Sequence, residues 1–454
     1  MSKVSPNVKS DKLRSKLLII SALLSYILRM KSIQHPKFYN TVLQAFPGKP
    51  AILLQSQLAG HPDSQKSYIA LKPLRTIKAF GSTVIETEGE SEKKFQSDPW
   101  QALKDFRERK KSWLFGYLGY DLKNFTEDLS SYNQPIINTP DLFFMEPEIL
   151  LAVDQSGRVE KIVGDLDLET IKESSTPRKG VLEGLKSEME VDEYKNKVLK
   201  IKRLISEGDF YEANYSFPMV GEFQGDPFWL FEKMRSINPV PFAAYINTNE
   251  FSVCCASPER FLKREGNHIV SEPIKGTAAR SDDADEDSAL KNKLTSEKNR
   301  AENLMIVDLV RHDFSRVAKT GTVRVSKLYD VKTFDTVHQL ISTVEADLKE
   351  ESDSVDVIKA CFPMGSMTGA PKIEVMKAIE DMETYRRGIY SGAIGYFQPN
   401  GDFDFNVVIR SAIIQNEKLV YPVGGAITSD SDADDEWEET MVKAKTITKI
   451  IDDN

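Results

Sequence analysis

Short apolar runs that end in glycine, proline or charged residues recur along most of this chain. Residues 51–60, 67–73, 82–89 and 113–121 are examples, and runs of this length and composition are typical of β-strands. Many are spaced as hairpins rather than as crossovers, which favours antiparallel pairing. Between them the sequence predicts helices near 285–318, 354–361, 371–383 and 432–451. The pattern therefore predicts an α+β fold with mainly antiparallel sheets and helices packed on the outside.

A polar stretch rich in serine, proline and glycine divides the chain. The organisation that we expect is an N-terminal extension (1–35), an N-terminal region (36–165), a linker (166–190) and a C-terminal catalytic region (191–454). Directly after the linker, the spacing of apolar residues predicts a helix that begins near Asp192 and ends at Gly208.

The extension contains an apolar run, residues 17–28, preceded by basic residues. This run is shorter than the roughly 20 residues that a bilayer span needs. It ends at Arg29-Met30-Lys31 rather than in the small residues of a signal cleavage site. We therefore expect no membrane association, and an alternative is that Met30 is the natural start, which N-terminal sequencing would test.

Charge and cysteine content exclude other classes. The chain has 60 Lys and Arg against 69 Asp and Glu, a formal charge of −9, so no basic excess is available for nucleic-acid phosphates. Three cysteines are too few for a disulfide framework and are typical of a reducing cytosol, so we expect a cytoplasmic protein.

Two expected helices carry glutamates suited to a divalent cation. Glu302 heads an apolar stretch, and a buried carboxylate needs a partner or a cation. In the last helix, Glu436, Glu439, Thr440 and Lys443 fall on one face. Two glutamates facing one cavity would suit Mg²⁺ with retained waters and a substrate carboxylate. The alternative is that these carboxylates lie on solvated helix faces.

Other features are suited to an anion. The glycine-containing loop at 365–376 leads into a helix N-terminus, where amides bind carboxylates and Thr368 adds a hydroxyl. Gly424-Gly425 ends an expected strand and can expose consecutive amides. Arg410, charged among apolar neighbours, is suited to a bidentate carboxylate contact. The features together suggest a small polycarboxylate bound through Mg²⁺; taken singly, each is equally a cap, a turn or an ion pair.

A third candidate is Lys275, between Pro273 and Gly276. The flanking residues predict a sharp turn that would hold the lysine against the protein. A lysine that is partly desolvated, or close to a metal, loses its proton more easily and becomes a nucleophile. Glu259, one strand earlier, is placed to act as general acid and base. The alternative is an ordinary surface lysine.

These motifs, in this order, resemble the chorismate-utilising enzyme family over about 208–445. The resemblance lies in SPERF (257–261), PIKGTAAR (273–280), RAENLMIVDLVRHD (300–313), FPMGSMTGAPK (362–372), RRGIYSGAIGY (386–396), VVIRSA (407–412) and EWEETMVKAK (436–445). The family includes anthranilate, aminodeoxychorismate, isochorismate and salicylate synthases. It implies two packed, mainly antiparallel sheets with the active site in a cleft between them.

The resemblance also implies residue roles. Glu302 and Glu439 become Mg²⁺ ligands with Glu436 beside them, Lys275 the nucleophile, and Glu259 the acid and base. The residues implied to bind the substrate are Thr277, Thr368, Tyr396, Arg410, Gly424, Gly425 and Lys443.

Lys275 distinguishes the subfamilies. Anthranilate synthases typically have alanine there, whereas PIKGT is similar to component I of the aminodeoxychorismate synthases. In that subfamily the lysine is thought to attack carbon 2 of chorismate and expel the carbon 4 hydroxyl, before ammonia displaces it at carbon 4. The resemblance thus implies Mg²⁺-dependent amination of chorismate to 4-amino-4-deoxychorismate, for para-aminobenzoate and folate biosynthesis. The alternatives are anthranilate synthase component I and a catalytically silent binding subunit.

Two positions depart from the family pattern. Gln339 stands where the family usually has histidine, and His338 lies one place early, so we assign His338 no catalytic role. Glu212 replaces a family glutamine; isochorismate- and salicylate-forming members have a water-activating lysine there, so Glu212 argues against water as the nucleophile.

The ammonia source is expected to be a separate protein. None of the cysteines has the strand-to-helix elbow of a glutaminase, which implies a glutamine amidotransferase partner subunit. The stretch 53–56 lies where related enzymes hold a tryptophan between their sheets, so a bound tryptophan is also possible.

Overall fold

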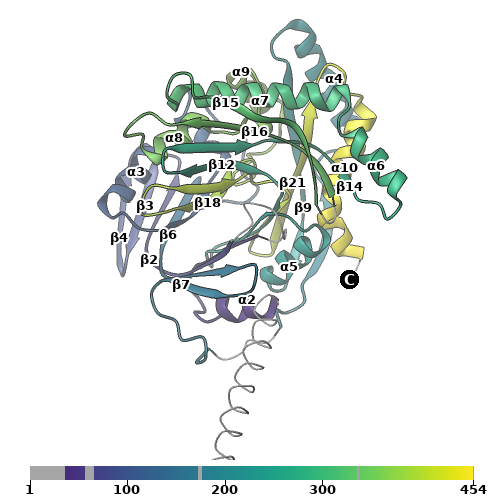
Figure 1. Ribbon diagram of the computed structural model, residues 1–454. Helices are drawn as coiled ribbons and strands as arrows, with labels where there is room; N and C mark the ends of the chain where they lie inside the picture. Colours follow the sequence, from purple (N-terminus) through teal and green to yellow (C-terminus); the bar gives the residue numbers. More distant parts are fainter. Residues whose placement is uncertain (1–35, 57–65, 172–175, 335–336, 453–454) are drawn as a thin grey trace, which may run out of the picture.

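The computed structural model describes residues 36–56, 66–171, 176–334 and 337–452 (Figure 1). The predicted N-terminal extension, including Met30, lies outside these residues. All the strand pairs named below are antiparallel, and helices cover the outside of the sheet, so the predicted α+β class is confirmed (Figure 1). No helix in the described part of the chain has both the length and the apolar character needed to cross a bilayer.

The helices are α2 (Pro36–Leu43), α3 (Pro99–Arg109), α4 (Val191–Glu207), α5 (Pro227–Ile237), α6 (Ala284–Lys293), α7 (Glu297–Val317), α8 (Ser354–Cys361), α9 (Lys372–Met382) and α10 (Ala433–Asp452), with 3₁₀ turns η1 (Tyr120–Phe125) and η2 (Gly365–Met367). The strands are β1 (Ala51–Gln55), β2 (Lys66–Phe80), β3 (Thr83–Glu88), β4 (Ser91–Gln96), β5 (Leu114–Leu118), β6 (Leu142–Asp154), β7 (Val159–Val163), β8 (Val181–Ser187), β9 (Glu212–Gln224), β10 (Phe242–Asn247), β11 (Ser252–Ser257), β12 (Arg260–Glu265), β13 (His268–Glu272), β14 (Ile274–Ala279), β15 (Arg324–Thr333), β16 (Val337–Asp347), β17 (Gly369–Ala370), β18 (Ala393–Phe397), β19 (Phe403–Asn406), β20 (Ser411–Gln415) and β21 (Lys418–Ile427).

The two expected sheets are two halves of one hydrogen-bonded network. The first half runs β8–β9–β21–β20–β11–β10–β1, and the second runs β5–β18–β19–β12–β13–β16, with β14 and β15 also on β16. The long strands β2 and β6 belong to both halves. Their register shifts between Pro73 and Arg75, where β2 passes from one half to the other.

Side chains alternate between an inner and an outer core, as the period of two in a strand requires. On β1, Ile52 points into an apolar cluster between the halves, whereas Leu53 packs outward against a cluster that includes residues of α4 and α10. On β5, Phe115 points inward and Leu114 outward, toward α3, α7 and α8. Apolar side chains fill the space between the halves, and the ion pair of Lys275 with Glu212 lies where β9 meets β14 (Figure 1).

Two local predictions differ from the structure. The helix expected near 285–318 is two helices, because the chain leaves α6 after Lys293 and the Ser296 hydroxyl then caps α7 by accepting from the amide of Asn299. Residues 181–187 of the predicted linker form β8, which pairs with β9.

Candidate active site

Lys275 lies in an irregular stretch of β14. The pairing of β14 with β16 shifts register between Ile274 and Thr277, and Gly276 adopts φ +86°, which favours glycine. A side chain at Gly276 would approach Leu294 to 3.1 Å. Bulges of this kind redirect a side chain, so Lys275 lies at an irregularity within a strand rather than in the sharp turn that was predicted.

Two carboxylates hold the Lys275 ammonium. Its Nζ atom lies 2.8 Å from Oε1 of Glu212 and 3.6 Å from Oε2 of Glu302. The lysine side chain is only 12% exposed, so it is not an ordinary surface lysine. Burial alone would lower the pKa of Lys275, but the charges of Glu212 and Glu302 outweigh it and raise that pKa. The two carboxylates therefore favour the protonated form of Lys275, whereas burial alone would favour the neutral amine.

Glu212 is the site residue that sequence reasoning did not place. It begins β9, is buried, and its second oxygen, Oε2, has no hydrogen-bond partner among the described residues. The sequence marks Glu212 as a departure from a family pattern, but its contact with Lys275 joins residues far apart in the chain and depends on how the two halves meet.

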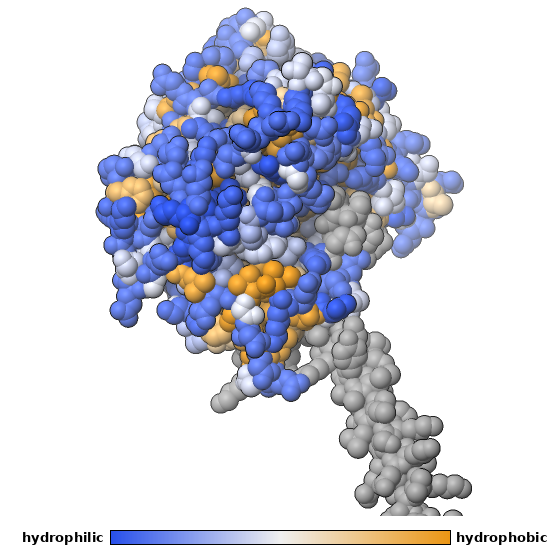
Figure 2. All heavy atoms as spheres, turned by 60° about the vertical axis from the view of Figure 1, so that its left-hand side comes forward, coloured by the Kyte–Doolittle hydropathy of each residue, from blue (hydrophilic) through white to orange (hydrophobic). Residues whose placement is uncertain are grey.

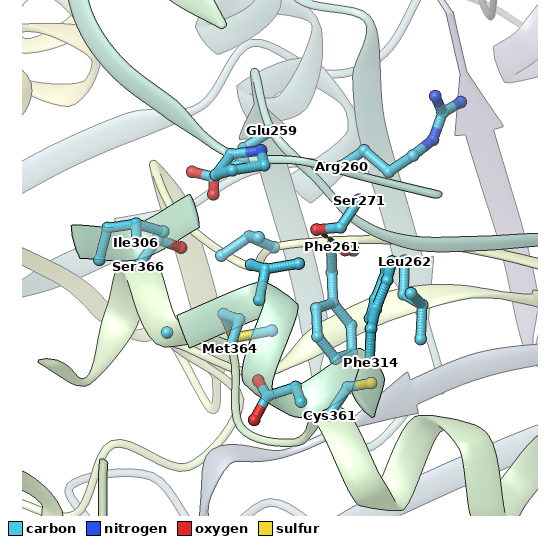
Figure 3. A pocket seen from close by; sticks show the side chains of 15 residues that line it. Glu259, Arg260, Phe261, Leu262, Ser271, Ile306, Phe314, Cys361, Met364 and Ser366 are labelled. Atoms are coloured by element: carbon cyan, nitrogen blue, oxygen red, sulfur yellow. Dashed lines mark hydrogen bonds between the residues drawn. The ribbon is translucent and has the colours of Figure 1, made fainter. Parts of the chain in front are cut away.

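Glu259 lies between β11 and β12 and is buried. Burial raises its pKa to about 7, although the Ser366 hydroxyl and the charges of Lys275 and Arg410 partly offset this. Glu259 and Ser366 also line a cavity of about 20 Å³ behind the site, and they lie on the same side of it (Figure 3). A carboxyl group with a pKa near neutrality can both donate and accept a proton at physiological pH.

The three predicted metal ligands each face a lysine. Besides the contact of Glu302 with Lys275, Glu436 lies 3.2 Å from Lys298, and Glu439 lies 2.9 Å from Lys443. No cluster of three acidic, histidine or cysteine side chains at metal-binding spacing occurs in the described ranges.

The donor set nevertheless fits magnesium. Burial raises the pKa of both Glu302 and Glu436, and the charge of Glu439 adds to each shift. Glu439 itself faces outward, with 58% of its side chain exposed. Mg²⁺ usually takes one or two protein carboxylates and retains waters, and a cation among these glutamates would relieve their mutual repulsion.

The anion-binding candidates partly converge on the same region. Arg410 lies between β19 and β20, with φ +51°, and its charge interacts with Glu259. Gly424 and Gly425 do not end a strand as predicted; they lie within β21 and pair with β9, so they form no nest of free amides. The Lys443 Nζ atom donates to the carbonyl oxygen of Gly424 at 3.1 Å. A side chain at Gly425 would approach this Nζ to 3.4 Å.

Two predicted substrate contacts, Thr368 and Tyr396, lie in other surroundings than expected. The hydroxyl of Thr368 is fully buried and donates to the carbonyl of Met364 at 3.1 Å, so it stabilises the loop that contains it. Tyr396 packs against Tyr68, and the three steps β18–β19–β12–β13 place it roughly 14 Å across the sheet from the strand line of Lys275.

Thr277 follows Lys275 by two residues on β14 and lies beside the neighbouring strand β16. Thr277 is exposed and stands opposite the buried Gln339 in the β14–β16 ladder. His338 points elsewhere: its ring contacts Thr333 at 2.9 Å and Asp287 at 2.9 Å, which ties α6 to β16.

The stretch predicted to accompany a bound tryptophan, residues 53–56, forms the end of β1. Gln55 is buried, and its Oε1 atom has no hydrogen-bond partner among the described residues. Tryptophan binding at this place stays a prediction.

Comparisons of the sequence and of the structure with known proteins point to one family. Residues 49–449 match the family described as chorismate binding enzyme. The chain is 32% identical over 436 residues to aminodeoxychorismate synthase component 1 of Escherichia coli, covering 92% of this chain and 96% of that protein. It is 34% identical over 366 residues to anthranilate synthase component 1 of Aquifex aeolicus, covering 75% and 74%. The structure of anthranilate synthase component I from Streptococcus pneumoniae superposes with a TM-score of 0.73 at 27% identity, covering 86% of this chain and 93% of that one.

Proposed function

Because this chain belongs to the chorismate binding enzyme family, we propose that it aminates chorismate at carbon 4 to give 4-amino-4-deoxychorismate. The observation that carries the proposal is Lys275, a largely enclosed lysine that contacts two carboxylates, with Glu259 close by. The full-length similarity to relatives named aminodeoxychorismate synthase component 1 supports the same reaction.

Lys275 is the proposed nucleophile. Its Nζ atom first gives a proton to the carboxylate of Glu212, 2.8 Å away, and then, as a neutral amine, bonds to carbon 2 of chorismate while the carbon 4 hydroxyl departs. Glu212 and Glu302 fix the position of Nζ before attack, because they contact it at 2.8 and 3.6 Å. Ammonia then bonds to carbon 4, and the bond between carbon 2 and Nζ breaks.

Glu259 is the proposed general acid and base. With a pKa of about 7 it is partly protonated at neutral pH, so it can give a proton to the departing hydroxyl, which leaves as water. The resulting carboxylate can then take a proton from the attacking ammonia. Buried position and raised pKa both favour this dual role.

Glu302, Glu439 and Glu436 are the proposed residues for Mg²⁺. A bound magnesium ion would neutralise the glutamates and attract the carboxylates of chorismate to the site. Arg410 and Lys443, the cations at the same edge, are proposed to orient those carboxylates.

The ammonia is proposed to come from a separate glutamine amidotransferase subunit, since no cysteine is arranged as a glutaminase nucleophile. All three cysteines are buried, and burial raises the pKa of each thiol, which is the opposite of an activated thiolate. The product would then serve para-aminobenzoate and folate biosynthesis.

One assay tests the function. Purified protein is incubated with chorismate, MgCl₂ and ammonium, and the products are separated and identified by mass. We expect 4-amino-4-deoxychorismate. Anthranilate as the product would assign the chain to the other synthase type, and no turnover would indicate a silent subunit.

Replacing the nucleophile tests the mechanism. Lys275→Ala should lose both amination and any covalent adduct seen by intact-mass spectrometry, because no other amine replaces Nζ. Lys418→Ala is a matched control, since Lys418 is exposed at the far end of β21. Wild-type kinetics for Lys275→Ala would remove Lys275 from the mechanism.

A further inference from the structure

Lys298 lies among the three glutamates proposed for magnesium and forms an ion pair with one of them. Its Nζ atom is 3.2 Å from Oε1 of Glu436 and donates a hydrogen bond to it. The charge of Lys298 also interacts with Glu302 and Glu439, so all three carboxylates share one ammonium group. Unlike the many hydrophilic side chains of the outer face shown in Figure 2, Lys298 therefore faces carboxylates as well as water. The proposed reaction does not use this lysine.

Two helices bring Lys298 to the glutamates. Lys298 and Glu302 are four residues apart on α7, so their side chains lie on one face of that helix. Glu436 lies in the first turn of α10, where the Ser431 hydroxyl donates to the same Oε1 atom at 2.6 Å. The carboxylate of Glu436 is therefore held by Ser431 from the side of α10, and the ammonium reaches it from α7.

The other two lysines near these glutamates are held by additional groups. Lys275 donates to Glu212 at 2.8 Å. Lys443 donates to the carbonyl oxygen of Gly424 at 3.1 Å. Within the described residues, Lys298 makes its one hydrogen bond to the glutamates themselves. Its side chain is 43% exposed, more than that of either other lysine, so Lys298 is the cation that moves into water most easily.

The Lys298 ammonium and a magnesium ion would compete for the same carboxylates. Without a metal, neighbouring carboxylates repel one another, and a shared cation offsets this repulsion. A dication at these carboxylates would repel a neighbouring ammonium twice as strongly as a single charge would. The flexible four-carbon stem of lysine then allows the ammonium to turn into water.

We propose that Lys298 is a built-in counter-cation of the magnesium site. It neutralises the three glutamates when the metal is absent and leaves them when the metal binds. Magnesium binding must therefore break the ion pair of Lys298 with Glu436, and this lysine lowers the affinity of the site for the metal. The proposal rests on the magnesium site of the proposed function and adds to it a residue that tunes the affinity of that site.

Lysine labelling detects the movement in the wild-type protein. The protein is acetylated to a low level with and without MgCl₂, and the peptides are analysed by mass spectrometry. Labelling of Lys298 should rise roughly twofold with the metal, because full release would about double a side-chain exposure of 43%. Sodium chloride at the same ionic strength should not reproduce the rise. Labelling of Lys445, which is exposed on α10, should not change.

Lys298→Met removes the competing charge. Isothermal titration calorimetry should show MgCl₂ binding roughly two- to fivefold more tightly than in the wild type, since no partly exposed ion pair has to be broken. Lys298→Arg, which keeps a cation, should bind with wild-type affinity. Lys445→Met is the matched control, because it removes the same charge from α10, on the side away from Lys443, and should leave the affinity unchanged.

Three results would overturn the proposal. Weaker magnesium binding by Lys298→Met would mean that the lysine only positions the glutamates. Equal affinity of Lys298→Met and wild type would mean that the two cations do not compete. Unchanged labelling of Lys298 in protein that binds magnesium would mean that the ammonium does not leave. A wild-type protein that binds no MgCl₂ in the calorimeter would instead refute the magnesium site of the proposed function, and this proposal with it.

Discussion

Glu259 illustrates how burial alone can prepare a residue for acid–base work. Its pKa, near 7, lies well above the ordinary value of 4.5, chiefly because the carboxyl group is buried. If the protonated form starts the reaction, kcat/KM should fall as pH rises through about 7. Glu259→Gln should lower kcat/KM by roughly 10²- to 10⁴-fold, the usual contribution of a general acid or base, and should abolish this pH limb. Steady-state kinetics between pH 5.5 and 9 would measure both.

The raised pKa of Glu259 also predicts how the stability of the protein depends on pH, which gives an independent check of that pKa. Between pH 4.5 and 7 the folded state binds more protons than the unfolded state, so stability falls as pH rises through this window. Over this window the free energy of unfolding of the wild type should fall by about 3 kcal/mol. Glu259→Gln should not show this fall. Urea unfolding at pH 5 and pH 8 would measure it, with the exposed Glu265→Gln as control. Parallel stability profiles for wild type and Glu259→Gln would contradict the assigned pKa.

Glu302 tests the metal proposal. Removing its charge with Glu302→Gln should weaken Mg²⁺ binding at least tenfold, since even changes outside the ligand shell cost 10- to 100-fold. Isothermal titration calorimetry with MgCl₂ measures this without any reaction. Glu297→Gln, exposed in the first turn of the same helix, is the matched control. An unchanged affinity in Glu302→Gln would exclude Glu302 as a ligand.

Among the elements, β21 shows how closely two strands approach beneath the site. A side chain at Gly424 would lie 2.3 Å from the carbonyl oxygen of Tyr215 on β9, closer than any real contact. Gly424→Ala must therefore force the ladder apart and should destabilise the protein by about 1–3 kcal/mol. The neighbouring Gly425→Ala meets Lys443 Nζ at 3.4 Å and oxygens of Glu436 and Thr440 at 3.7 Å, which are ordinary contacts, and should keep wild-type stability. Urea unfolding of the two variants gives the comparison; equal midpoints would contradict this view of the ladder.

The elements also show what the sequence could and could not predict. Local signals sufficed for α4, where Gly208 ends the helix with φ +91° as expected. They failed between α6 and α7, where a break at Ser296 interrupts a continuous helical pattern. At the site, the family resemblance implied that Lys275 and Glu302 belong to one site, and the two side chains lie 3.6 Å apart. The position of Tyr396 could be predicted only from the strand order, and the pairing of Glu212 with Lys275 only from the way in which the two halves of the sheet meet. A local sequence pattern contains neither kind of information.

At the scale of the whole molecule, distant segments meet beneath the site through one buried ion pair. The Arg387 guanidinium contacts Glu383 at 2.6 Å and also donates to the carbonyl oxygens of Met367 and Asn214, at 2.7 and 2.8 Å. Glu383 in turn accepts from the backbone amide of Ser216 on β9. The pair therefore fixes η2, β9 and the segment after α9 relative to one another, and with them Glu212 at the start of β9.

Arg387→Met should destabilise the protein by about 3–5 kcal/mol, because it leaves Glu383 as a buried charge without its cation. Adding Glu383→Gln should recover part of that loss, since the remaining amide carries no charge to desolvate. A double-mutant cycle from urea unfolding measures the coupling, which should exceed about 1 kcal/mol for residues in direct contact. Strictly additive effects would mean that the two side chains stabilise these segments independently, and that the strand ladder rather than this pair holds the segments in place.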